Sequence, residues 1–326
     1  MYHIVYYVVP VVVLIIVRKY RESKWGKCKN KVKLDKKLAI VTGANSGIGL
    51  QLAKELAARN AHVILACRDI EKAREACIYI NQKLSADPVL IPMELDLASL
   101  QSITKFSEEI KKQFPEVNIL VNNAGVSFPN TKRIETEDGF EIHFGVNHLG
   151  HFYLTNLLLD VLTAGSARVV VVSSSLHEKG EINLDDLNSL SLTKKTNLYA
   201  NSKLANVYFA QELAQRTKGK INVYTCCPGW VYTNLFRHSI KWYHYFLILP
   251  VAFFFMRSPK QGAQTPLYCA TEPDLEKETG LIYRDCKHYS SRAIFYSNIA
   301  AQLWEKSDEM IKEALQKHNR HGDGDS

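Results

Sequence analysis

Short apolar runs of strand length recur along the chain from residue 37 onward, and helix-compatible segments separate them. Each run is rich in valine, isoleucine or leucine, whereas the intervening segments mix apolar and charged positions. This alternation predicts one α/β domain with a doubly wound, mostly parallel sheet of about seven strands. The expected strands are residues 37–42, 62–66, 89–94, 117–121, 167–172 and 221–226; the expected helices are 50–60, 70–84, one starting near Ser99, a long one from about 139, 197–218 and 295–318.

The chain begins with a different pattern. Residues 2–17 carry no formal charge and are largely apolar, a length just short of the roughly 17–25 residues that span a bilayer as a helix. A cleaved signal peptide normally has its charges before the apolar run and a small-residue cleavage site, and neither is seen here. We expect residues 1–17 to be a hydrophobic membrane anchor, which either spans the bilayer or inserts from one side.

Residues 18–37 form a basic tract. They contain ten Lys or Arg and two acids, so this tract carries a charge of +8, equal to the net charge of the whole chain. The remainder balances to zero, which argues against nucleic acid as a partner. Beside an apolar segment such a tract attracts anionic lipid headgroups and stays in the cytosol. We expect a basic juxtamembrane linker, with the catalytic domain facing the cytosol at the endoplasmic reticulum membrane or a lipid droplet surface; a solvated linker is the alternative.

Cysteine and histidine usage indicates neither disulfides nor a metal site. The seven cysteines are scattered and form no C-x-x-C pair, which is typical of reduced thiols in the cytosol. His143, His148 and His151 lie in one helical run, but their spacings place them on different faces and no carboxylate partner is evident. We expect these histidines to be structural.

A glycine-rich turn follows the first expected strand. Gly43, Gly47 and Gly49 lie between that strand and a helix-forming run. Glycines allow a tight turn with close backbone approach, and a helix N-terminus favours the negative charge of a pyrophosphate. The strand, turn and helix predict the phosphate-binding unit of a Rossmann-like domain that binds a dinucleotide.

Tyr199 and Lys203 are four residues apart in an expected helix, so they lie on one face. An ammonium group within roughly 4–6 Å favours the phenolate and lowers the tyrosine pKa from its usual value of about 10. A lowered pKa suits proton transfer at neutral pH. This spacing also occurs by chance on solvated helices, so the pair gains meaning only from its context.

The motifs together resemble the short-chain dehydrogenase/reductase family over roughly residues 36–290. Residues 42–49 are similar to its T-G-x3-G-x-G turn, residues 122–125 to its N-N-A-G motif and residues 172–174 to its V-S-S motif. Residues 199–203 match its Y-x3-K pattern and residues 228–229 its P-G motif. The retinol dehydrogenase-like subgroup is the nearest in appearance, on the runs 66–69, 143–152 and 261–265 and on a polar insertion at 178–196.

The resemblance implies roles for four catalytic residues. Tyr199 exchanges a proton with the substrate oxygen, and Lys203 lowers the pKa of Tyr199 and binds the ribose hydroxyls. Ser174 binds and polarises the substrate oxygen, although the three consecutive serines leave Ser175 as a rival. Asn147 positions a water molecule that links Lys203 to solvent.

The resemblance also implies NADP(H) as the cofactor. Cys67 stands where NAD-preferring relatives carry an acid, and Arg68 can pair with a 2′-phosphate, although Asp69 leaves NAD(H) open. Asp96 would contact the adenine amino group; its alternative role is in the N-cap region of the helix near Ser99. The full expected set is Gly43, Asn45, Ser46, Gly47, Ile48, Gly49, Arg68, Asp96, Leu97, Asn123, Ala124, Gly125, Tyr199, Lys203, Pro228, Gly229, Val231 and Thr233.

The substrate side is expected at a variable lid, residues 233–259, which contains an apolar run at 246–256. This run is either a buried helix or a membrane-contacting lid that admits a lipid-soluble substrate. The expected function is that of a membrane-associated NADP(H)-dependent oxidoreductase that interconverts a hydrophobic alcohol and its aldehyde or ketone. Retinol and retinal are the first-choice substrate pair. Polyprenols, steroids and lipid aldehydes are alternative substrates, and a non-catalytic NADP(H)-binding membrane scaffold is the alternative of another class. The catalytic domain would cover residues 38–318, and residues 319–326 would form a disordered tail. The sequence does not decide whether the chain forms a homo-oligomer.

Overall fold

The computed structural model describes residues 2–85, 88–129, 133–191, 196–233 and 254–322, with the backbone alone for 2–11 and 319–322. Its centre is an eight-stranded sheet in the order β3-β2-β1-β4-β5-β6-β7-β8. The strands from β3 to β7 in this order pair in parallel, and β8 pairs antiparallel with β7. The strands are β1 (Leu38–Thr42), β2 (His62–Cys67), β3 (Leu90–Glu94), β4 (Ile119–Asn122), β5 (Arg168–Val172), β6 (Asn222–Cys227), β7 (Leu281–Arg284) and β8 (Lys287–His288).

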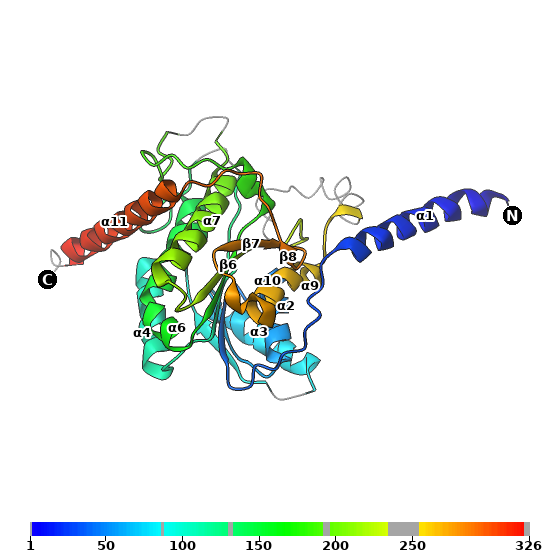
Figure 1. Ribbon diagram of the computed structural model, residues 1–326, viewed down its shortest axis with the longest axis horizontal. Helices are drawn as coiled ribbons and strands as arrows, with labels where there is room; N and C mark the ends of the chain where they lie inside the picture. The colour runs from blue at the N-terminus through cyan, green and yellow to red at the C-terminus, as the bar shows by residue number, and fades with distance from the viewer. Residues whose placement is uncertain (1, 86–87, 130–132, 192–195, 234–253, 323–326) are drawn as a thin grey trace.

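Helices cover both faces of the sheet, as the sequence predicts (Figure 1). One apolar core joins the sheet to α4, α5, α7 and α11, and a second core joins its other face to α2, α3 and α10. The central strands are buried on both faces, which explains why they read as continuous apolar runs rather than alternating ones. The helices are α2 (Gly47–Ala57), α3 (Ile70–Lys83), α4 (Leu100–Gln113), α5 (Gly150–Leu157), α6 (Leu159–Ala164), α7 (Leu198–Thr217), α9 (Pro259–Gly262), α10 (Gln264–Thr271) and α11 (Ser297–Gly322), with a π-helix η1 (Phe144–Leu149) and 3-10 turns η2 (Ser175–Lys179) and η5 (Pro273–Lys277).

The strand order reverses between β1 and β4. From β1 the chain winds outward to β2 and β3, then returns to β4 on the other side of β1 and continues to β7. In open α/β sheets, ligands bind at the carboxyl ends of the strands beside such a reversal. The glycine turn follows β1, and the motif at residues 122–125 begins with the last residue of β4, so both motifs lie at this position.

The N-terminal helix α1 (Tyr2–Lys24) extends away from the domain (Figure 1). The apolar side chains of residues 12–17 are exposed to solvent. Among the described residues, no helix combines the length and the apolar character that crossing a bilayer requires. The expected anchor at 1–17 lies mostly where side chains are not described, so it stays a prediction.

The basic tract is not a free linker. Arg18 Nη1 donates to the Met256 carbonyl at 2.8 Å, Cys28 N–H donates to Gln264 Oε1 at 3.2 Å, and Leu34 N–H donates to the Arg59 carbonyl at 2.7 Å. Residues 18–34 therefore run along the domain surface and are held at several points. The sequence does not reveal these contacts, because the charges alone are equally compatible with a solvated segment.

Two further expectations need correction. The sheet has eight strands rather than about seven, because Asp285 and Cys286 both adopt positive φ (56° and 54°) and form a two-residue turn that pairs β8 with β7. The expected tail at 319–326 is in part helical, since α11 continues to Gly322. Most of the expected lid, residues 234–253, lies outside the described residues.

Candidate active site

The glycine turn leaves room for a phosphate at the start of α2. A side chain at Gly49 would place its Cβ 2.4 Å from the Gly43 carbonyl oxygen and 2.6 Å from Asn123 Nδ2, so the turn can close only with glycine there. Ser46 is the N-cap of α2 but makes no capping hydrogen bond with its side chain. The first N–H groups of the helix are therefore available to an anion, and the site fits a dinucleotide pyrophosphate.

Thr42 joins the glycine turn to the segment after β4. Its Oγ1 accepts hydrogen bonds from the N–H groups of Asn123 and Ala124, both at 2.9 Å. The Asn123 amide in turn donates to the Thr42 carbonyl at 2.8 Å. These contacts hold residues 123 and 124 beside the glycine turn, and their expected role in cofactor binding stays a prediction.

An exposed arginine follows the carboxyl end of β2. Arg68 is exposed, whereas the Asp69 carboxylate caps α3 by accepting from Lys72 N–H at 3.2 Å and also pairs with Lys72 Nζ at 3.0 Å. Cys67 is buried beside the glycine turn, and burial raises the pKa of its thiol to about 11, so it is uncharged. The carboxylate that could disfavour a 2′-phosphate is therefore turned toward α3.

Asp96 and Leu97 follow β3 at the same edge. Asp96 Oδ1 accepts from Ala98 N–H at 3.0 Å, while Ser99 is the N-cap of α4 and accepts from Ser102 N–H at 3.2 Å. Asp96 thus shapes the turn before α4 without being its N-cap. The expected adenine contact of Asp96 stays a prediction.

Tyr199 and Ser174 lie against each other. Tyr199 is the second residue of α7, whose N-cap Asn197 accepts from Ala200 N–H at 3.1 Å. Ser174 follows β5, and its hydroxyl hydrogen-bonds the Tyr199 phenol and also accepts from Leu176 N–H at 3.2 Å. Ser175 instead begins the turn η2. Of the two rival serines, Ser174 is the one that the structure brings to the tyrosine.

Lys203 lies one helical turn from Tyr199 and is buried. Its Nζ is 5.7 Å from the centroid of the Tyr199 ring and donates to the Val172 carbonyl at 3.1 Å. Burial lowers the pKa of Lys203 to about 8, although the thiols of Cys226 and Cys227 act in the opposite direction.

The pKa of Tyr199 departs from the sequence expectation. Burial raises it, Cys227 adds to this, and the hydrogen bond from Ser174 opposes it only in part. The expected lowering by Lys203 is not found, because the ammonium points to the Val172 carbonyl and both groups are removed from water. The four-residue spacing is confirmed as a shared helix face, but it does not make a phenolate.

Asn147 lies in the π-helix η1, a deviation that is frequent at functional sites. Its Oδ1 accepts from Val126 N–H at 2.8 Å, and its Nδ2 donates to the Val126 carbonyl at 3.1 Å and to Ser202 Oγ at 3.0 Å. A Cβ at Gly125 would lie 3.1 Å from Asn147 Oδ1 and 3.5 Å from Lys203 Nζ. Asn147 and Lys203 therefore approach the same backbone segment after β4.

Residues 228–233 return to the glycine turn after β6. Pro228 and Val231 are buried, and the Thr233 methyl group lies 3.2 Å from the Cβ position of Gly47. This contact brings residues 228–233 beside the glycine turn, and their expected role in cofactor binding stays a prediction.

His143 does have a carboxylate partner, Glu141, which the sequence did not reveal. Glu141 is 1% exposed and its Oε1 binds His143 Nδ1 at 2.6 Å. His143 Nε2 accepts from Phe128 N–H at 2.9 Å, and its ring packs edge-on against Tyr199 at 6.5 Å between centroids. The pair fixes the backbone beside the phenol. An E-x-H spacing is too common to have identified it.

The three histidines of this region have structural partners. His151 Nδ1 donates to the Asn147 carbonyl at 3.0 Å, so its Nε2 accepts from the Thr42 hydroxyl at 2.9 Å. His148 Nε2 pairs with Ser307 Oγ of α11 at 3.1 Å. In the part of the chain that the structure describes, no three potential metal ligands gather.

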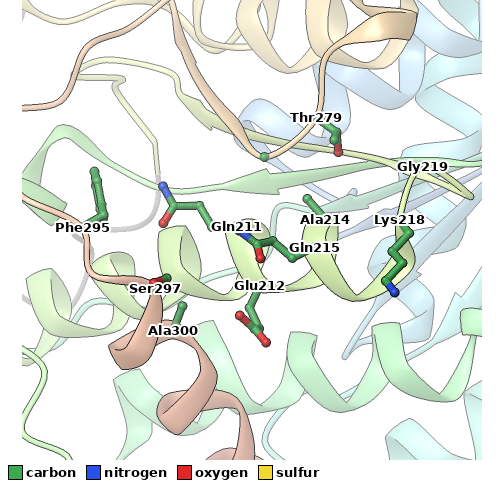
Figure 2. A pocket seen from close by; sticks show the side chains of 11 residues that line it. Gln211, Glu212, Ala214, Gln215, Lys218, Gly219, Thr279, Phe295, Ser297 and Ala300 are labelled. Carbon is green, nitrogen blue, oxygen red and sulfur yellow. The ribbon is translucent and has the colours of Figure 1, made fainter.

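A cavity of about 560 Å³ lies away from these side chains, between α7, α11 and the turn at Thr279 (Figure 2). Its α7 residues run from Gln211 to Gln215, so it begins twelve positions after Tyr199, or roughly 18 Å along the helix. It therefore takes no part in the chemistry at Tyr199.

Comparison with known proteins agrees with this geometry. Residues 37–244 match the family model described as short chain dehydrogenase. The chain is 44% identical to retinol dehydrogenase 14 of Mus musculus over 290 residues, covering 84% of this chain and 86% of the relative. It is 39% identical to retinol dehydrogenase 11 of Mus musculus, covering 93% and 95%. A crystal structure of an uncharacterized protein from Mycobacterium paratuberculosis superposes with a TM-score of 0.68 at 31% identity, covering 88% of this chain and 98% of that one.

Proposed function

The chain belongs to the short-chain dehydrogenase/reductase family, in its retinol dehydrogenase-like subgroup, and from this premise we propose that it interconverts retinol and retinal, or a closely similar lipid alcohol and its carbonyl, with NADP(H). Membership makes it an NAD(P)-dependent oxidoreductase that acts on CH–OH groups. The observation that carries the proposal is the contact between Ser174 and Tyr199, with Lys203 and Asn147 beside them.

The chain's own residues handle the proton and the substrate oxygen. Ser174 orients that oxygen and stabilises the charge that develops on it, and Tyr199 donates a proton to it in reduction or accepts one in oxidation. Lys203 and Asn147 connect the phenol to the cofactor ribose and to solvent. The nicotinamide cofactor supplies or accepts the hydride.

The substrate proposal follows from the relatives and from the described surface. Two relatives with about two-fifths of their residues identical are named retinol dehydrogenases. Trp230 and Tyr232, which flank the buried Val231, are about half exposed, so aromatic surface surrounds the segment that leads to the expected lid. Polyprenols, steroids and lipid aldehydes suit the same surface and are the alternative substrates.

The preference for NADP(H) rests on Arg68. Its guanidinium is exposed at the end of β2, and the neighbouring Asp69 is engaged with Lys72. Guanidinium groups bind phosphates in a bidentate manner, so Arg68 suits the 2′-phosphate.

One assay tests substrate and cofactor together. Purified protein is incubated with retinal or a lipid extract, with NADPH or NADH, and products are identified by mass spectrometry. We expect reduction of retinal with NADPH preferred, and Arg68→Asp should reverse the preference toward NADH. A wild type that prefers NADH would exclude the role of Arg68, and cofactor binding without turnover of any extract component would support the non-catalytic scaffold instead.

Membrane attachment is a separate part of the proposal. The exposed apolar residues 12–17 and the basic residues that follow them support insertion of α1, with the catalytic domain in the cytosol at the endoplasmic reticulum or a lipid droplet. A glycosylation acceptor added at the C-terminus should remain unmodified in cells. Its glycosylation would place the domain in the lumen.

A further inference from the structure

Arg257 is a buried cation between the cofactor side of the domain and the N-terminal segment. It is 6% exposed, and its Nη2 pairs with Asp285 Oδ1 at 2.7 Å while its Nη1 donates to the Pro228 carbonyl at 3.1 Å. An arginine removed from water in this way is retained only where its partners are fixed. The partners here belong to the turn before β8 and to the segment after β6.

The backbone of Arg257 holds the same segment. Arg257 N–H donates to the Trp230 carbonyl at 2.7 Å, and Tyr232 N–H donates to the Arg257 carbonyl at 2.9 Å. At Gly229, φ is 86° and a Cβ would lie 2.8 Å from Arg257 Cζ, so the glycine backbone rests directly on the guanidinium. Residues 228–232 are therefore joined to Arg257 by three hydrogen bonds, which involve Pro228, Trp230 and Tyr232.

The N-terminal segment covers the guanidinium from outside. The Trp25 ring lies between two arginines, 5.1 Å from Arg257 Cζ and 4.8 Å from Arg18 Cζ. Gly26 N–H donates to Asp285 Oδ1 at 3.1 Å, the oxygen that also pairs with Arg257. A Cβ at Gly26 would lie 2.0 Å from the Asp285 backbone, so the segment approaches this turn as closely as a chain can.

We propose that Trp25 and Arg257 form a clamp by which the N-terminal segment positions residues 228–233 against the nicotinamide end of the cofactor. Arg257 and Trp25 act through that segment and are positioning residues, not catalytic ones. The segment before the sheet is then part of the active enzyme and not only a tether. This inference rests on the nicotinamide site proposed above.

The test uses the full chain and measures cofactor binding without substrate. NADPH affinity is read by fluorescence, and hydrogen exchange is followed at the Tyr232 amide, whose acceptor is Arg257. Trp25→Ala should weaken NADPH binding about three- to tenfold and speed exchange at Tyr232, because a desolvated cation–π contact is lost. Trp25→Phe should retain most of the wild-type NADPH affinity and most of the protection of the Tyr232 amide. Arg257→Met should weaken NADPH binding and speed exchange at Tyr232 more than Trp25→Ala does.

A matched control is Arg216→Met. Arg216 also stacks on a tryptophan, Trp304, with its Cζ 4.7 Å from the ring centroid, but at the far end of α7. This variant should leave NADPH affinity and Tyr232 exchange at wild-type values. If Arg257→Met fails to fold, the comparison of Trp25→Ala with Trp25→Phe tests the clamp.

Two failures are distinguishable. A wild type that does not bind NADPH would overturn the proposed nicotinamide site. A wild type that binds NADPH, together with a Trp25→Ala variant of unchanged affinity and unchanged Tyr232 exchange, would overturn the clamp and leave the proposed function intact.

Discussion

Burial opposes charge on both partners of the Tyr199–Lys203 pair. The pKa of Lys203 is lowered to about 8 and that of Tyr199 is raised, in each case mainly because the side chain is removed from water. Lys203 is thus the member of the site that titrates near neutral pH. Its ammonium is directed to the carbonyl of Val172, the last residue of β5, and Ser174 lies two positions further along the chain.

This environment predicts opposite pH dependence in the two directions of the reaction. Oxidation releases a proton, which neutral Lys203 can accept, so the oxidation rate should rise as pH increases through about 8. Reduction consumes a proton and should decline over the same interval. Measuring kcat/KM in both directions from pH 6 to 10 checks this, because this ratio reports the groups of the free enzyme, and profiles without any inflection between about pH 7 and 9 would contradict the assignment.

The serine assignment predicts unequal effects at adjacent positions. Ser174→Ala removes the hydroxyl that contacts Tyr199 and should lower kcat by about 10²- to 10³-fold, the loss typical of one donor to a developing oxyanion. Ser175→Ala should stay close to wild type, because Ser175 belongs to η2. Steady-state turnover of both variants checks this, and the reverse order of effects would shift the catalytic role to Ser175.

At the residue scale, the sequence predicted that Tyr199 and Lys203 share a helix face, but it did not predict the directions of their pKa shifts. The structure brings Ser174 to Tyr199, and it brings Asn147 and Lys203 to Gly125, whereas the catalytic roles implied by the family resemblance stay predictions. The pKa directions depend mainly on the burial of both side chains, and residues distant in sequence, such as Cys227, modify them. Helical spacing alone contains no information about that burial.

At the scale of elements, continuous apolar runs predicted the strands well. The second strand was expected at 62–66 and is His62–Cys67, and the helix expected at 197–218 is Leu198–Thr217. The helix expected from about 139 is instead divided into η1, α5 and α6, with Asn147 in the π-helical part. A π-helix has no recognisable hydrophobic period, so this division could not be read from the sequence.

The strand β8 was missed for a similar reason. Its turn places Asp285 and Cys286 at positive φ without a glycine or an Asn-Gly pair. The turn is held by tertiary contacts, since Asp285 Oδ1 binds both Arg257 and the N–H of Gly26. Those partners are 28 and 259 residues away and give no local signal.

The amphipathic helix α11 was predicted, but its packing partners were not. Trp304 packs 4.8 Å from Phe152 of α5 and 5.8 Å from Phe209 of α7, between ring centroids. His148 lies beneath this contact and is 1% exposed. The helix therefore covers a buried histidine that is held uncharged.

This burial predicts acid sensitivity. The pKa of His148 is about 3 in the folded chain, lowered by burial from an ordinary 6.5. Below pH 6.5 the unfolded chain gains a proton that the folded chain does not, so stability should fall as pH decreases toward 3. For this one group the loss between pH 7 and pH 5 is about 2 kcal/mol.

The measurement is the free energy of unfolding in urea at pH 7 and pH 5. His148→Gln carries no titrating group and should lose about 2 kcal/mol less than the wild type over this interval. The exposed His288→Gln serves as the matched control and should behave as the wild type. Equal losses in all three proteins would show that His148 does not set the acid sensitivity.

At the scale of the whole molecule, the N-terminal helix contacts Met256, which lies near the C-terminal end of the segment expected to form the lid. Arg18 of α1 donates to the Met256 carbonyl, and the next residue, Arg257, is hydrogen-bonded through its backbone to Trp230 and Tyr232. In Figure 1, α1 leaves the domain on this side. If α1 inserts in a bilayer as proposed, a lipid-soluble substrate would approach the enzyme beside residues 228–233.

The sequence predicted the single α/β domain, and the expected anchor at residues 1–17 stays a prediction. It could not show that residues 18–34 pack on the domain, because the eight basic residues of this stretch fit a solvated tract equally well. Only the folded chain brings Trp25 to Arg257, which are 232 positions apart. Contacts of this range decide whether a terminal segment is a tether or a part of the site.

The central claim is that Tyr199 exchanges the proton in hydride transfer between NADP(H) and a hydrophobic carbonyl. The most direct measurement compares Tyr199→Phe with wild type and with Tyr79→Phe, an exposed tyrosine on α3, for NADPH affinity and for NADPH-dependent reduction of retinal. The account predicts that Tyr199→Phe lowers turnover by about 10²- to 10⁴-fold while NADPH affinity stays at the wild-type value, and that Tyr79→Phe changes neither. Unchanged turnover by Tyr199→Phe would contradict the account.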